Sequence, residues 1–85
     1  MREFKNAIEA SKIVDELRAQ LHTINFNSDL RKYLRNIEAQ VTQLSKAEVI
    51  ARRNNSDGYM SISHQKLTDS INYLEKMILL AKLMQ

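Results

Sequence analysis

Several residue types are missing from this sequence of 85 residues. It has no cysteine, which excludes disulfide bonds and thiolate metal sites. It has no proline and a single glycine, so almost nothing in it interrupts a helix. No apolar run approaches the roughly 18 to 20 residues that a membrane span requires, and nothing resembles a secretion signal. We therefore expect a cytoplasmic protein without a transmembrane segment.

The composition is rich in residues that favour helices, namely Leu, Ala, Glu, Lys, Gln and Arg. It predicts an all-α fold, and the length predicts a single domain, 1–85. A domain of this size buries a smaller fraction of its surface than a larger one does. Because association with a second copy is a common remedy, we expect a homo-oligomer, most simply a homodimer.

The longest regular pattern covers residues 28–54. Its apolar residues follow one another in steps of four and three, which places them on one face of an α-helix. They are Leu30, Leu34, Ile37, Val41 and Leu44. Asn27 and Ser28 offer N-terminal caps, and Arg52 and Arg53 precede the polar stretch that ends the helix at Asn54.

Two further amphipathic helices are expected, at about 3–23 and 62–84. The apolar positions of the first are Phe4, Ala7, Ile8, Val14, Leu17, Leu21 and Ile24. Those of the last are Leu67, Ile71, Leu74, Ile78 and Ala81, with Ser61 or Ser63 as its cap. Short connections favour antiparallel neighbours, so the sequence predicts an antiparallel helical bundle. Either the three helices of one chain form the complete bundle, or two chains pair through their longest helices.

The excess of positive charge lies entirely on the central helix. Its candidate anion-binding residues are Arg31, Lys32, Arg35, Arg52 and Arg53. Arg31 and Arg35 are one helical turn apart, which suits two phosphate contacts, although Glu38 is placed to pair with Arg35. Binding of nucleic acid, or of a phosphate-containing small ligand, through this helix is therefore the alternative function.

The chain is most apolar near its end, where residues 77–84 read MILLAKLM. Leu79, Leu80 and Leu83 lie outside the predicted core stripe of their helix. They project partly to the side of the stripe and partly to the opposite face. We predict a partner-binding surface made of Met77, Leu79, Leu80, Leu83 and Met84 with the flanking charges Lys76 and Lys82. Its occupant is a second copy, a different protein or a membrane-associated helix.

No catalytic or cofactor signature is present: the sequence has no glycine-rich phosphate loop, HExxH, GxSxG or CxxC motif. His22 and His64, the only histidines, lie near predicted helix ends, where surface and capping roles are usual. We expect no enzymatic activity, no cofactor and no metal. The favoured function is a protein–protein interaction module that regulates or inhibits a partner protein.

As a short helical chain without proline or cysteine, with a basic centre and an apolar C-terminal helix, the sequence resembles the small cytoplasmic helical proteins of T4-like bacteriophages. The segments that carry this resemblance are AIEASKIVDELRAQLHTINF, DLRKYLRNIEAQVTQLSKAEVIARR and INYLEKMILLAKLM. Among such proteins, the lysis-inhibition antiholins are the most similar in size and class. The resemblance implies a regulator that binds the cytoplasmic part of a holin and delays lysis.

Overall fold

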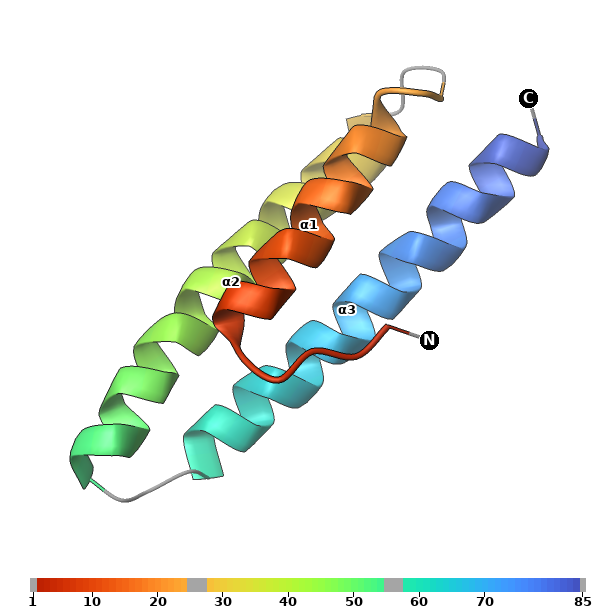
Figure 1. The fold of residues 1–85 in the computed structure, drawn as a ribbon. Helices are drawn as coiled ribbons and strands as arrows, with labels where there is room; N and C mark the ends of the chain where they lie inside the picture. The colour runs from red at the N-terminus through yellow and green to blue at the C-terminus, as the bar shows by residue number, and fades with distance from the viewer. Residues whose placement is uncertain (1, 25–27, 55–57, 85) are drawn as a thin grey trace.

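The fold is an antiparallel bundle of three helices, seen here in a computed structural model that describes residues 2–24, 28–54 and 58–84. The helices are α1 (Ala7–Leu21), α2 (Ser28–Asn54) and α3 (Gly58–Leu83). They form a rod of 48 × 19 × 17 Å (Figure 1). No strand occurs among the described residues, and the predicted all-α fold is confirmed.

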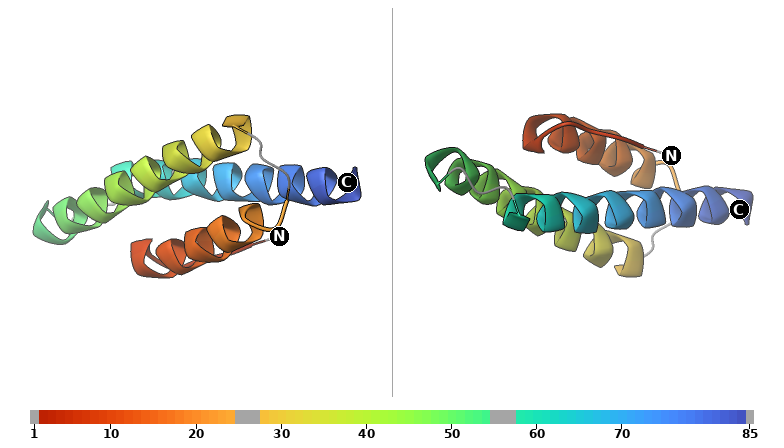
Figure 2. Two further views of the ribbon diagram at one scale, coloured as in Figure 1. Left: turned by 90° about the horizontal axis from the view of Figure 1, so that it is seen from above. Right: turned by 90° about the horizontal axis from the view of Figure 1, so that it is seen from below.

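The two long helices form the frame of the bundle. α2 packs against α3 and, to a smaller extent, against α1, whereas α1 and α3 contact each other little. The last turns of α3 extend beyond the ends of both other helices (Figure 2). In the part of the chain that the structure describes, no other helix therefore lies beside this end of α3.

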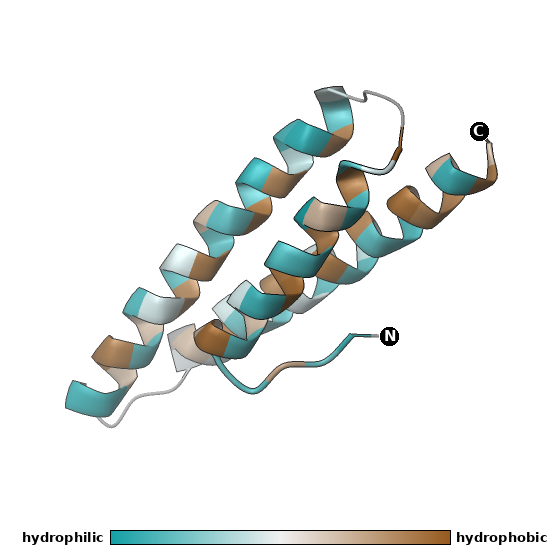
Figure 3. Ribbon diagram, turned by 45° about the horizontal axis from the view of Figure 1, so that its top comes forward, coloured by the Kyte–Doolittle hydropathy of each residue, from teal (hydrophilic) through white to brown (hydrophobic). Residues whose placement is uncertain are grey.

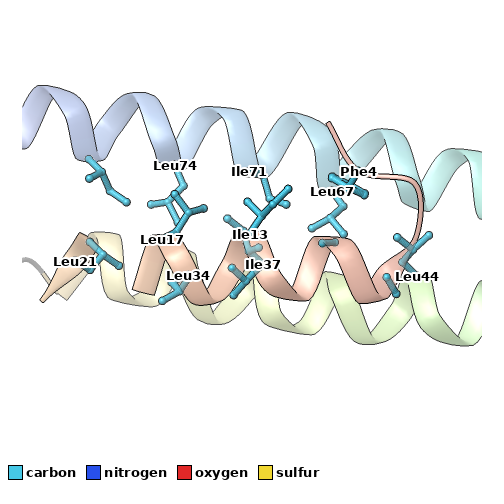
Figure 4. Close-up of a cluster of buried hydrophobic side chains, with 14 of the residues drawn as sticks. Phe4, Ile13, Leu17, Leu21, Leu34, Ile37, Leu44, Leu67, Ile71 and Leu74 are labelled. Atoms are coloured by element: carbon cyan, nitrogen blue, oxygen red, sulfur yellow. The ribbon is translucent and has the colours of Figure 1, made fainter. Parts of the chain in front are cut away.

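The hydrophobic core lies along the axis of the bundle, and the apolar stripes predicted for α2 and α3 are confirmed as parts of it. Figure 4 shows Ile13, Ile37 and Ile71, one from each helix, at the same level of the bundle. Leu30, Val41 and Ala81 are partly buried against the core. Its buried members are Phe4, Ala7, Ala10, Ile13, Val14, Leu17, Leu21, Ile24, Leu34, Ile37, Leu44, Leu67, Ile71, Leu74 and Ile78.

The first helix begins later than predicted, at Ala7 rather than near residue 3. Asn6 has extended backbone angles (φ −154°, ψ 177°), and its side-chain oxygen accepts a hydrogen bond of 3.0 Å from the Glu9 amide. Asn6 thus caps α1 and ends the preceding non-helical segment. The predicted inward position of Ile8 is wrong: its side chain is 70% exposed, because it lies one residue past Ala7 and faces away from the core.

Residues 2–6 form an N-terminal strap that runs across α3 (Figure 1). Phe4 is only 5% exposed, and its ring centroid lies 4.5 Å from that of His64. The Phe4 carbonyl accepts a hydrogen bond of 2.8 Å from His64 Nε2. The strap therefore fills the space that the poor contact between α1 and α3 leaves, and His64 has a structural role.

The charged end of the strap is held by three polar side chains. The Arg2 amide donates to Asn72 Oδ1 at 2.8 Å. The Arg2 guanidinium pairs with Glu75 at 2.8 Å and with Glu16 at 2.7 Å. These carboxylates, the Glu75 hydrogen bond first, raise the pKa of Arg2 above its ordinary value. Arg2 thus links the strap to both α1 and α3.

The third helix begins earlier than predicted, at Gly58 rather than residue 62. Ser61 and Ser63 lie inside it and do not cap it. Met60 packs against the core about two turns before Leu67, which extends the inward stripe of α3 toward its N-terminus.

Candidate protein interaction surface

The predicted partner-binding residues lie on the C-terminal half of α3. Hydrophobic residues gather in its last turns (Figure 3). Four of them form what we call the C-terminal apolar patch, with exposed fractions of 59% for Leu79, 43% for Leu80, 74% for Leu83 and 86% for Met84. A protein seldom leaves so many neighbouring large apolar side chains in water unless the surface is used.

The orientation of the patch explains its exposure. Leu74 and Ile78 point into the core and are almost completely buried. Leu80 follows Ile78 by two residues, which turns it about 200° round the helix and thus to the opposite side. Since the last turns of α3 also extend beyond α1 and α2, nothing in the described part of the chain covers this side.

The other predicted members of the surface flank the patch. Lys76 and Lys82 are exposed, and neither takes part in an ion pair within the described ranges. Met77 is half-buried and lines a groove of about 230 Å³ between α2 and α3. Tyr33 and Tyr73 also line this groove, with ring centroids 5.2 Å apart. The surface therefore continues from α3 toward α2.

The predicted anion-binding residues do not form one site. All five are exposed on α2, with Arg31, Lys32 and Arg35 near its start and Arg52 and Arg53 in its last turn. Arg52 follows Arg31 by 21 positions, which correspond to roughly 32 Å of helix. Two separate basic groups therefore lie at opposite ends of the bundle, the first at the same end as the C-terminus of α3 (Figure 1).

The expected pairing of Glu38 with Arg35 is wrong. Glu38 instead pairs with Arg18 of α1, which also binds Asp15 at 2.7 Å. The hydrogen bonds to Glu38 and Asp15, in that order, raise the pKa of Arg18 above its ordinary value. Arg18 and Glu38 join α1 to α2 at the half-exposed edge of their contact.

A shallow groove between α1 and α2 was not anticipated from the sequence. Its volume is about 570 Å³, and Lys12 of α1 and Lys46 of α2 both line it. Neither lysine has an ion-pair partner among residues 2–24, 28–54 and 58–84. Ser11, Thr42 and Ser45 add hydroxyl groups, so this groove offers an anion two cations and several donors.

The described residues hold neither a candidate metal site nor a candidate membrane-spanning helix. Among the described residues, no group of three His, Cys, Asp or Glu side chains is placed to hold a metal ion. No helix in this part of the chain is both long enough and apolar enough to span a membrane. His22 is exposed at the C-terminal cap of α1.

Comparison of the chain with protein-family models, with curated proteins and with solved structures found no match. The most distinctive part of the surface is the C-terminal apolar patch, because it holds four of the nine exposed large apolar side chains among the described residues.

Proposed function

We propose that this protein is a non-enzymatic interaction module that regulates or inhibits a partner protein by packing the C-terminal half of α3 against it. The observation that carries the proposal is the orientation of the C-terminal apolar patch. Leu79, Leu80, Leu83 and Met84 face away from the core, on turns that no other part of the described chain covers.

The chemistry of the patch fits an amphipathic partner helix. Adjacent leucines supply apolar anchors, which contribute most of the binding free energy in such contacts. Lys76 and Lys82 lie at its edge, where charges mainly guide the encounter and select partners with acidic side chains. For the antiholin class that the sequence resembles, this partner would be the cytoplasmic part of a holin.

The test compares two exposed apolar positions. Leu83→Asp places a charge in the patch, at a side chain that is 74% exposed, whereas Ile8→Asp places one on α1, at a side chain that is 70% exposed. In cells that contain a holin, we expect expression of the native chain and of Ile8→Asp to delay lysis, and Leu83→Asp to lose this effect with unchanged helical content. An equal effect of both variants would contradict the proposed surface.

Binding of an anion through α2 is the second candidate. The groove that Lys12 and Lys46 line favours it more than the five predicted residues do, because it brings together two lysines that have no ion-pair partner among the described residues. A short DNA oligonucleotide should then bind at low salt and dissociate as the salt concentration rises. Lys46→Gln should weaken binding more than Arg53→Gln; absence of binding at low salt would exclude this function.

A further inference from the structure

The exposed side of α3 carries a regular pattern along its whole length, not only at the patch. Starting at Ile62, exposed residues follow one another in steps of four and three residues, the spacing of coiled-coil contacts. We call this row the outer stripe. Its members are Ile62, Lys66, Asp69, Tyr73, Lys76, Leu80 and Leu83.

The outer stripe has the same spacing as the inner stripe that forms the core. Asp69, Tyr73, Lys76 and Leu80 each follow a buried residue by two positions. Because two residues turn a helix by about 200°, α3 presents one coiled-coil face to the core and a second, exposed face away from it. Tyr73, which is 52% exposed, also contacts Tyr33 of α2 with its ring. The strap contacts α3 beside this second face and leaves all of its members exposed.

The outer stripe is complementary to itself when two copies of α3 lie antiparallel. With Tyr73 on the two-fold axis, Ile62 faces Leu83 of the second copy, and Asp69 faces Lys76. Each contact occurs twice, as in every two-fold symmetric interface. Lys66 faces Leu80, and its long aliphatic stem can cover a leucine while the ammonium group stays in water.

Charge favours this orientation over the parallel one. Neither Asp69 nor Lys76 has an ion-pair partner among the described residues; Asp69 accepts only a hydrogen bond of 2.9 Å from Gln65. In an antiparallel pair these opposite charges meet twice. In a parallel pair each would face its own copy, and such like-charge contacts are unfavourable.

The positions beside the outer stripe agree with close pairing. Their own side chains carry no charge, and the nearby guanidinium of Arg2, whose amide binds Asn72, is paired with Glu75 and Glu16. On one side they are Gln65, Asn72 and Leu79, and on the other Ser63, Ser70, Met77 and Met84. Leu79 and Met84, both members of the C-terminal apolar patch, would thereby leave water together with Leu80 and Leu83.

We propose that a second copy of this chain binds the outer stripe, antiparallel and with the two-fold axis at Tyr73. This inference rests on the proposed function, because it names a second copy of the chain as one occupant of the same interaction surface. The paired region, from Ile62 to Leu83, is roughly 32 Å long. A different partner protein then competes with the second copy for the C-terminal apolar patch.

Single cysteines test the register, because the native chain has none. Under mild oxidation Tyr73→Cys should form a disulfide-linked dimer, since two-fold symmetry brings both thiols together. Leu83→Cys is the matched control: its two thiols would lie about 30 Å apart in the antiparallel pair but side by side in a parallel one. Linkage of both variants, or of Leu83→Cys alone, would overturn the proposed orientation.

Charge exchange tests the contact between Asp69 and Lys76. Asp69→Lys and Lys76→Asp should each weaken the dimer about tenfold or more, measured by analytical ultracentrifugation over a dilution series. The double variant should recover dimerisation, and an equal mixture of the two single variants should form heterodimers. Failure of both rescues would overturn the pairing.

The outcomes separate this inference from the proposed function. If the native chain stays monomeric at millimolar concentration while Leu83→Asp still loses the effect on the partner, only the self-pairing is wrong. If Leu83→Asp affects neither dimerisation nor the partner, the proposed function fails as well. Circular dichroism of each variant confirms that helical content is retained.

Discussion

Replacing Phe4 by alanine tests whether the N-terminal strap stabilises the fold. The Phe4 side chain is 5% exposed, and burial of an aromatic ring of about 150–250 Å² contributes roughly 4–6 kcal/mol. Ordering the strap costs about 1–2 kcal/mol of backbone entropy per residue, part of which the variant recovers when the strap detaches. We therefore expect Phe4→Ala to lower the free energy of unfolding by about 3 kcal/mol.

Thermal unfolding, followed by circular dichroism at one protein concentration, measures this loss. In a domain of this size 3 kcal/mol corresponds to a fall in Tm of roughly 12–24 °C. Ile8→Ala is the matched control, since Ile8 lies near the same end of α1 but is 70% exposed, and we expect its effect to stay within about 0.5 kcal/mol. Equal Tm values for the two variants would refute the role of the strap.

Three other substitutions test the N-terminal cap, the core packing and the ion pair of α1. Asn6→Ala should cost about 1 kcal/mol in urea unfolding because it removes the cap on the Glu9 amide, and no change would mean that another group caps the helix. Leu17→Ala should cost about 3 kcal/mol, since Leu17 is completely buried; a loss below 1 kcal/mol would contradict this packing. Arg18→Gln should cost less than about 1 kcal/mol, because its pair with Glu38 is half-exposed, and the loss should shrink further at high salt.

Periodicity was sufficient to predict the long helices. The bounds predicted for α2 agree with the structure, because the steps of four and three residues continue from Leu30 to Leu44 and end signals stand on both sides. The inward stripe of α3 was predicted for the same reason. An amphipathic helix in a small bundle has few other ways to remove its apolar residues from water.

The start of α1 was predicted wrongly because the spacing of apolar residues does not show where a helix begins. Phe4 keeps the spacing of the stripe although it belongs to the strap, where its ring reaches the core from outside α1. The local signal was present: Asn6 followed three residues later by Glu9 is a capping pattern, and the Glu9 carboxylate accepts from the Lys5 amide at 3.3 Å. This pattern marks Asn6 as the N-cap and Ala7 as the first residue of the helix.

Contacts between different helices could not be predicted from the sequence. Arg18 pairs with Glu38, and Lys12 and Lys46 line one groove, because α1 and α2 pack with a particular rotation and offset. Neither quantity follows from the period of a single helix. By contrast, the exposed members of the C-terminal apolar patch were predicted. A helix end that is apolar on every side has more apolar residues than its own core can bury.

The strap also has a consequence for how the chain folds. The hydrogen bond from Arg2 to Asn72 joins residues 70 positions apart, whereas α2 and α3 are consecutive in the chain and form a local hairpin. Contacts between distant parts of a chain close late, because the intervening segments must first be ordered. We therefore expect the hairpin of α2 and α3 to form first and the strap to dock last. In hydrogen exchange, the Arg2 amide should then exchange by local opening, well before the amides of the buried turns of α2.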